Sequence, residues 1–276
     1  MPCGSGMLRR RAGPSIDLRS RAAESRVRRP FLLLQARNPG DPMLEHERLC
    51  FLRGLELEPE DLFTVNAVER LPTAEELAAC AGVLIGGSGD YSVLDPHRWI
   101  ADLVAFTRDD LVLRGKPTFA SCFGFQILVL SIGGAMVRDP ARSEVGTFDL
   151  ALEGAARDDP IFSNLPAIFR AQVGHNDRAT VLPSGVQPLA SSALCPLHAF
   201  RVHSLPIWAT QFHPELDQAT MKDRFRRYRA LYGSPDPEAD ELFLASLQPS
   251  EEASLLLLLF ARWVAAHDEE LARLGI

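Results

Sequence analysis

The chemistry that this sequence suggests centres on Cys122. It stands in ASCFG, residues 120–124, between a segment that predicts a strand, 117–122, and one that predicts a helix, 124–134. A nucleophile on such a tight strand-to-helix turn needs small residues two positions before and after it, because bulky side chains would collide. The helix N-terminus favours the thiolate, and the N–H of Phe123 is placed to face a developing oxyanion. We therefore predict a nucleophile here rather than a buried, inert thiol.

A cysteine nucleophile needs a base, and the base needs a group that orients it. His213 and Glu215 lie two residues apart in QFHPE, which closes a predicted strand. On an extended segment they project to the same face, so Glu215 is placed to accept the second ring N–H of His213. We expect no chemistry from the histidines in helical patterns, which should be solvated, or from those that flank a strand: His46, His97, His267, His198 and His203.

A third candidate is the glycine loop GGSGD, residues 86–90, which follows the apolar segment 82–87. Such glycines often form a plain turn after a strand. The functional interpretation is that the N–H of Gly87 faces the same point as Cys122 and gives a second oxyanion donor.

These candidates must be positioned by the surrounding elements, which alternate between strand and helix in the first half. We predict strands at 30–37, 62–68, 82–87 and 117–122, and helices at 43–55, 95–115 and 124–134, with a capped helix that starts after Thr73 and has Glu76 three residues on. Such alternation predicts an α/β fold with an open, mostly parallel sheet and helices on both faces. Functional residues should then lie at the carboxyl ends of strands, where Gly87 and Cys122 both fall.

The second half has a different pattern. Short strands are expected at 146–152, 167–175, 186–192, 198–204 and 206–215, as an antiparallel section that feeds a last strand back into the main sheet. From residue 217 onward the chain is helical. In the helix at 43–55, Glu47 and Arg48 are expected to face outward.

Composition adds broad limits. The chain has 276 residues, is 46% hydrophobic and carries a net charge of −7, which favours a cytoplasmic enzyme or soluble binding protein and argues against nucleic acid as a partner. Residues 1–29 are rich in arginine and are expected to form a disordered tail. Five cysteines without a C-x-x-C pair argue against a disulfide scaffold and against a zinc site. The longest apolar run, 253–266, is too short to span a membrane.

Together, these residues resemble the triad, or class I, glutamine amidotransferase family. Its signature is a Gly-Gly loop, a G-x-C-x-G-x-Q elbow and a terminal H-P-E, and the chain shows 86–88, 122–126 and 211–215 in that order. The likeness covers about residues 30–216 and implies a flavodoxin-like three-layer fold for that domain, with residues 217–276 as a helical extension packed on it. VGHND, residues 173–177, is similar to a segment of GMP synthase amidotransferase domains.

The resemblance implies a role for each motif residue. Cys122 would attack the side-chain amide of L-glutamine and form a glutamyl thioester, with His213 as base and then acid and Glu215 as the orienting group. The N–H groups of Gly87 and Phe123 would bind the oxyanion. The glutamine would be held by the glycine loop, the elbow helix and the 173–177 loop, through Gly86, Ser88, Gln126, Gly174, His175, Asn176 and Asp177. No metal and no cofactor are implied.

Four positions depart from the family pattern without removing a catalytic atom. Ala120 replaces the first elbow glycine and Asn176 replaces a glycine of the substrate loop. Phe125 stands where His or Met is common, and Ser88 where Pro is common. These differences bear on the subfamily rather than on the reaction.

Three functions stay open on these residues. The first is a glutaminase subunit that passes ammonia to a separate synthetase, because the chain ends about 60 residues after Glu215. The second is a stand-alone hydrolase of γ-glutamyl amides or peptides, and the third is a non-catalytic regulator, against which the intact Cys, His and Glu argue. The basic stretch RFRRYR, residues 224–229, is expected to be a solvated helix face, with a docking surface for the synthetase as the alternative.

Overall fold

The computed structural model describes residues 29–275, apart from the side chains of residues 231 and 232, so the predicted tail lies outside it except for Arg29. The strands are β1 (Phe31–Gln35), β2 (Leu62–Asn66), β3 (Gly82–Ile85), β4 (Thr118–Ser121), β5 (Ala135–Arg138), β6 (Glu144–Leu152), β7 (Ile168–His175), β8 (Asp177–Val181), β9 (Val186–Ser191), β10 (Ala199–Val202) and β11 (Ile207–Thr210). The helices are α1 (Met43–Leu55), α2 (Ala74–Ala79), α3 (Arg98–Phe106), α4 (Phe123–Ser131), α5 (Gln218–Arg227), α6 (Arg229–Tyr232), α7 (Pro237–Ser246) and α8 (Glu251–Leu274).

The main sheet has 9 strands in the order β2-β1-β3-β4-β11-β10-β9-β6-β7. The strands from β2 to β11 in this order pair in parallel, and the remaining pairs are antiparallel. The last strand, β11, returns from the antiparallel section to the main sheet, as predicted, and the structure places it beside β4. This return is what brings the second half of the chain to Cys122.

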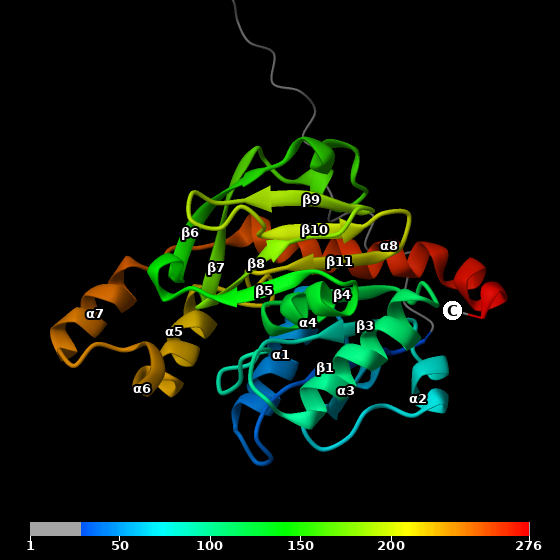
Figure 1. Ribbon diagram of the computed structural model, residues 1–276, viewed down its shortest axis with the longest axis horizontal. Coiled ribbons are helices and arrows are strands. Elements are labelled where there is room, and N and C mark those ends of the chain that lie inside the picture. The colour runs from blue at the N-terminus through cyan, green and yellow to red at the C-terminus, as the bar shows by residue number, and fades with distance from the viewer. Residues whose placement is uncertain (1–28, 276) are drawn as a thin grey trace, which may run out of the picture.

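Helices cover both faces of the sheet (Figure 1), which confirms the predicted three-layer α/β fold. Along β1, Phe31 and Leu33 join a buried cluster with residues of α1 and α8, whereas Leu32 and Leu34 join a cluster with residues of α2, α3 and α4. Successive side chains of a strand point to opposite faces, so a strand buried on both faces must be apolar throughout. Burial of β1 on both faces therefore explains the uninterrupted apolar run FLLL, residues 31–34.

Local signals set most helix boundaries. Thr73 caps α2, because its side chain accepts the N–H of Glu76 while the Glu76 carboxylate accepts the N–H of Thr73. The single helix predicted at 95–115 is wrong in detail: α3 ends at Phe106, and a wider helical turn follows at Thr107–Val112. The two-stranded sheet of β5 and β8 was not predicted, because both strands are short and partly exposed and so lack a clear apolar pattern.

The longest C-terminal helix, α8, packs on the same core as the sheet. Helix α8 contributes Leu256, Phe260 and Val264 to the cluster that contains Trp208 of β11. Figure 1 shows α5, α6 and α7 at one end of the molecule, and Met221, Phe225 and Leu244 from these helices form a smaller buried cluster.

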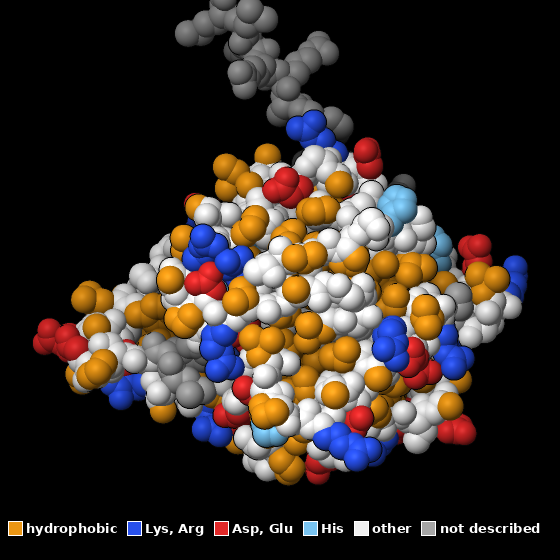
Figure 2. All heavy atoms as spheres, in the orientation of Figure 1, with side chains coloured by type: hydrophobic (Ala, Val, Ile, Leu, Met, Phe, Trp, Pro, Cys, Tyr) orange, Lys and Arg blue, Asp and Glu red, His pale blue; other side chains and the backbone are white. Residues whose placement is uncertain are grey.

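Two surface features follow from this arrangement. On the face in Figure 2, hydrophobic side chains gather over the middle of the molecule, and acidic and basic side chains are interspersed around them. Within residues 29–275, no single helix meets the length and apolarity of a membrane span, while α7 and α8, bent by 61°, meet them only as a pair.

Candidate active site

Cys122 occupies a strained turn between β4 and α4. Its φ is 51° and its ψ is −101°, a conformation that costs a non-glycine residue about 1–3 kcal/mol and that clusters at functional sites. The turn packs tightly on the end of β3, since a Cβ at Gly124 would lie 2.4 Å from the carbonyl oxygen of Ile85. Ala120 is fully buried in β4. The small residues on either side of Cys122 therefore have the steric reason that the sequence predicted.

The pairing of β11 with β4 brings His213 to the same edge as Cys122. Thr210 lies opposite Ser121 in this parallel register, and the Cys122 N–H donates to the Thr210 carbonyl at 2.8 Å. His213 follows three residues after Thr210, and its own N–H donates to the carbonyl of Gln172 in β7 at 2.8 Å. The histidine backbone is thus fixed between two strands of the sheet.

Glu215 fixes the histidine ring. Nδ1 of His213 lies 2.8 Å from Oε1 of Glu215, and both side chains are buried. This contact is the one predicted from the His-Pro-Glu spacing. It orients the ring and leaves Nε2 as the nitrogen available for chemistry.

The charges of His213 and Glu215 depend on each other. Burial opposes the charged form of His213, but the Cys122 sulfur and the Glu215 carboxylate outweigh it and raise the pKa of His213 to about 9. Burial likewise opposes ionisation of Glu215, but His213 and Arg224 lower the pKa of Glu215 to about 2. Near neutral pH the imidazolium form of His213 is therefore favoured.

Arg224 is a site residue that the sequence analysis missed. Its Nη1 lies 3.2 Å from Oε1 of Glu215 and 3.2 Å from Nδ1 of His213. Because Nδ1–H donates to Glu215, the guanidinium has the carboxylate as its true partner. Arg224 belongs to α5 and to the RFRRYR stretch, so the expectation of a solvated face is wrong for this residue, which is buried.

The rest of RFRRYR divides between core and surface. Phe225 and Tyr228 are buried, and the Tyr228 hydroxyl accepts from Nη1 of Arg37 at 2.6 Å. Arg226 and Arg227 are exposed and form ion pairs with Asp223 and Asp41. Helical spacing alone could not show this division, because the partners of Arg224 and Tyr228 lie elsewhere in the sequence.

The position of Glu47 also differs from the one that the sequence predicted. It was expected to face outward from α1, yet it is fully buried, and its two oxygens accept from Nη2 of Arg37 at 2.8 Å and from Nε at 3.1 Å. Nη2 of Arg224 lies 3.6 Å from Oε1 of the same carboxylate. The available signal was Arg37, the last residue of the apolar segment predicted as a strand at 30–37, because a buried cation needs an acidic partner.

Glu47 also holds the glycine loop. The N–H of Gly87 donates to Oε1 of Glu47 at 3.1 Å. In this structure that N–H is therefore directed at the carboxylate, and its use as an oxyanion donor stays a prediction that requires the peptide to turn. The loop does approach the histidine, since a Cβ at Gly87 would lie 3.0 Å from Cε1 of His213.

A cleft of about 440 Å³ opens beside Cys122. The residues predicted to contact substrate or oxyanion that line it are Ser88, Phe123, Gln126, Gly174, His175, Asn176 and Asp177. Nε2 of Gln126 lies 3.4 Å from the carbonyl oxygen of Asp177 and 3.4 Å from Oε1 of Gln211. The predicted substrate loop and the elbow helix thus lie together, while Gly86 lies behind the loop, where a Cβ would clash with the Glu47 carboxylate at 2.7 Å.

Two of the predicted substrate contacts already have partners. The carboxylate of Asp177 accepts from the hydroxyl of Ser92 and lies 3.4 Å from Nε of Arg138. The ring of His175 points to Glu144, with Nε2 at 3.2 Å from Oε2, so this side chain faces the protein interior. Nε2 of His198, which was expected to flank a strand without taking part in chemistry, lies 2.8 Å from the same carboxylate.

A sequence model of the class-I glutamine amidotransferase family matches residues 64–229, which is more than half of the chain and includes both Cys122 and His213. The chain therefore belongs to this family. Among its curated relatives are a glutamine-hydrolysing GMP synthase subunit of Methanocaldococcus jannaschii, 32% identical over 108 residues, and the GMP synthase of Porphyromonas gingivalis, 34% identical over 153 residues. The matches cover 39% and 55% of this chain, and 55% and 28% of those proteins.

Solved structures agree on the fold. A glutamine amidotransferase of Thermotoga maritima superposes with a TM-score of 0.67 at 16% identity, over 86% of this chain and 98% of that one. A glutamine amidotransferase of Methylobacillus flagellatus gives a TM-score of 0.58 at 19% identity, over 90% of this chain and 94% of that one. At these identities the likeness shows a shared fold.

Proposed function

We propose that the chain hydrolyses the side-chain amide of L-glutamine through a thioester on Cys122 and passes the ammonia to a separate synthetase. The main observation that supports this proposal is the strained Cys122 turn beside the hydrogen-bonded His213–Glu215 pair. In this mechanism the thiolate attacks the amide carbon while the His213 imidazolium donates its proton to the departing ammonia. A water molecule, deprotonated by His213, then attacks the thioester and releases glutamate.

The separate synthetase is supported by the names of several relatives. Those of Methanocaldococcus jannaschii and Thermococcus kodakarensis are each named as one subunit of a glutamine-hydrolysing GMP synthase. The aligned stretch spans 55% and 61% of those proteins, so the partner is argued by analogy with them. The exposed arginines Arg226 and Arg227, at the C-terminal end of α5, stay available as a docking surface, and the next exposed residue of RFRRYR is Arg229.

Steady-state comparison of two substrates tests the proposal against a γ-glutamyl hydrolase. We expect kcat/KM for free glutamine to exceed that for γ-glutamyl conjugates, measured as glutamate release with the purified chain alone and after addition of the synthetase component of a GMP synthase. This expectation rests on the match to the class-I glutamine amidotransferase family. A preference for γ-glutamyl peptides would contradict the glutaminase proposal and favour the hydrolase.

The pH profile should report the raised pKa of His213. Its charged form is retained below pH 9 and lost above it, so kcat/KM for glutamine is expected to fall as the pH rises through about 9. The stability that His213 contributes follows the same sign: it is fully present below its ordinary pKa of 6.5 and is lost as the pH passes 9.

Glu215→Gln separates this effect from titration of the substrate, whose amino group behaves identically with both enzymes. Removing the carboxylate removes one of the charges that raise the pKa of His213. The alkaline limb should then move to lower pH in a full rate profile. An alkaline limb at the same pH in the variant would show that Glu215 does not set the charge of His213.

A further inference from the structure

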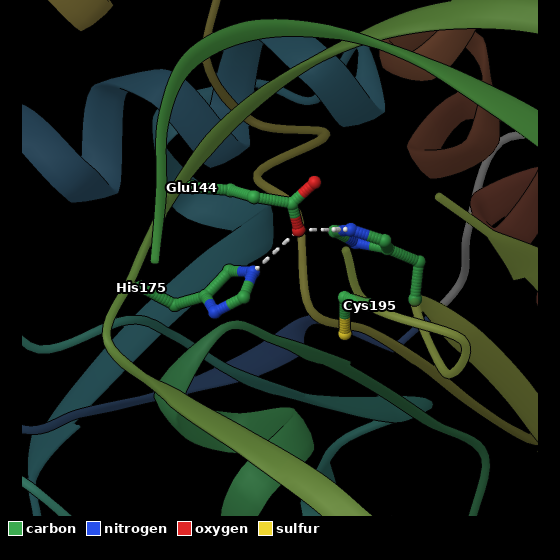
Figure 3. Close-up of side chains that lie close together, drawn as sticks. Glu144, His175 and Cys195 are labelled. Carbon is green, nitrogen blue, oxygen red and sulfur yellow. Dashed lines mark hydrogen bonds and ion pairs between the residues drawn. The ribbon is translucent and has the colours of Figure 1, made fainter. Parts of the chain in front are cut away.

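A second cluster of buried polar side chains lies apart from Cys122 and His213. It consists of Glu144, His175, Cys195 and His198, whose ligand atoms all lie within 4.8 Å of one another. Glu144 begins β6 and is paired with His175 at the end of β7, while Cys195 and His198 lie in the connection between β9 and β10. Figure 3 shows the side chains of Glu144, His175 and Cys195 lying around one space.

The carboxylate of Glu144 holds this cluster together. Oε2 accepts from Nε2 of His198 at 2.8 Å and from Nε2 of His175 at 3.2 Å, and Oε1 accepts from the Ser192 hydroxyl at 2.7 Å. One buried carboxylate thus links both histidines and the Ser192 hydroxyl.

The charge of Glu144 points to a cation. Among residues 29–275, the ion-pair partners of Glu144 are the two histidines, neither of which carries a permanent charge, and a buried carboxylate without a fixed positive partner is unfavourable. A divalent cation bound by the cluster would supply the positive partner that the Glu144 carboxylate lacks.

We propose that Glu144, His175, Cys195 and His198 bind a structural Zn²⁺ ion. Two imidazole nitrogens, one sulfur and one carboxylate oxygen are ligands that zinc takes in tetrahedral sites. Bond lengths of about 2.0–2.3 Å place tetrahedral ligand atoms about 3.3–3.7 Å apart. Since every pair of ligand atoms here is already within 4.8 Å, movements of about an ångström complete the tetrahedron.

Proton balance is simple for this binding step. The Cys195 thiol, which now donates to the Leu197 carbonyl at 3.6 Å, binds as thiolate and releases its proton to water. Each imidazole binds through Nε2 and carries its proton on Nδ1. All four ligands are buried, so no position is left for a substrate, and the site is structural.

The site would join parts of the chain that are far apart in sequence. It ties the start of β6 and the end of β7 to the β9–β10 connection, directly before Asn176 and Asp177, which line the cleft beside Cys122. The proposal uses none of Cys122, His213 and Glu215, and it shares only His175 with the predicted substrate contacts, whose ring already faces Glu144. Metal content can therefore be tested without reference to glutamine hydrolysis.

The test measures metal directly. The tag-free full-length protein is analysed for zinc by mass spectrometry, and the metal-free form is titrated with Co²⁺ in a Cys122→Ala background, so that the active-site thiol cannot contribute. We expect about one zinc per chain, a thiolate-to-cobalt absorption band that saturates at about one equivalent, and a higher thermal midpoint with metal than without it.

Two variants remove ligands while keeping the present hydrogen bonds. His198→Gln retains a donor to Glu144, and Cys195→Ser retains a donor to the Leu197 carbonyl; both should lose the zinc and its stabilisation, and Cys195→Ser should also lose the cobalt band. Cys80→Ser is the matched control, because this thiol is equally buried and also donates to a backbone carbonyl, at 3.2 Å. Wild-type protein without bound zinc or a cobalt band would overturn the proposal, as would equal zinc content in His198→Gln.

Discussion

Replacing Cys122 with alanine is expected to lower glutamate release from glutamine by roughly 10⁴- to 10⁶-fold, because the thioester cannot form without the sulfur. The loss should appear in kcat, with little change in folding, since alanine fills nearly the same space in the buried turn. Alanine must still adopt the positive φ of 51° at this position, which the wild-type cysteine already tolerates. Initial rates of glutamate formation, followed with coupled detection, measure the effect.

Cys80→Ala is the control for this prediction. Cys80 is buried, like Cys122, but it lies at the end of α2 and is not among the residues that line the cleft beside Cys122. It should keep wild-type kcat. An electrophilic glutamine analogue should label wild-type protein and Cys80→Ala, but not Cys122→Ala. Retention of more than about 1% of the rate in Cys122→Ala would exclude Cys122 as the nucleophile.

Glu47→Gln is expected to lower the free energy of unfolding by about 3–5 kcal/mol, because it leaves two buried arginines without their shared carboxylate. The side chains of Arg37 and Arg224 are only 1% and 8% exposed. Burial opposes the charged form of Arg37, but the Glu47 carboxylate outweighs this effect and raises the pKa of Arg37. The guanidinium therefore stays charged. Urea denaturation measures the change in unfolding free energy.

Glu45→Gln provides the comparison on the same helix. Glu45 is also paired with an arginine, Arg48 at 3.3 Å, but its side chain is 64% exposed. A solvated ion pair contributes about 0–1 kcal/mol, so this variant should unfold close to wild type. If the two variants were equally stable, the buried network would not be the source of the effect. Glu47→Gln should additionally lower kcat, because Glu47 holds both Arg224 and the Gly87 N–H.

Short local patterns in the sequence were enough to predict the catalytic candidates. Cys122 was predicted as the nucleophile because a strained turn requires small neighbouring residues, and Gly124 has no room for a Cβ. The His213–Glu215 contact was found because two residues on one extended segment share a face. Both signals lie within five residues, so no knowledge of distant contacts was needed.

Residues whose role depends on partners far away could not be found in this way. Glu47 occupies a polar stretch of α1 that looks solvated, and only the approach of Arg37 and Arg224 makes burial of its charge tolerable. The proposed zinc ligands follow the same logic: the search for C-x-x-C pairs does not detect a set with a single cysteine. Glu144 and His175 lie opposite each other only through the β6–β7 register.

By itself, the sequence determined the alternation of buried strands and helices, the cysteine elbow and the His-Pro-Glu pair, because hydrophobic periodicity and turn sterics act over a few residues. Only the tertiary structure decided that β11 lies beside β4, that Arg224 reaches Glu215 and that the Gly87 N–H is bound to Glu47. Buried charges must be satisfied by whichever groups the fold brings near. Strand order and helix packing determine which groups these are, and neither can be read from a short stretch of sequence.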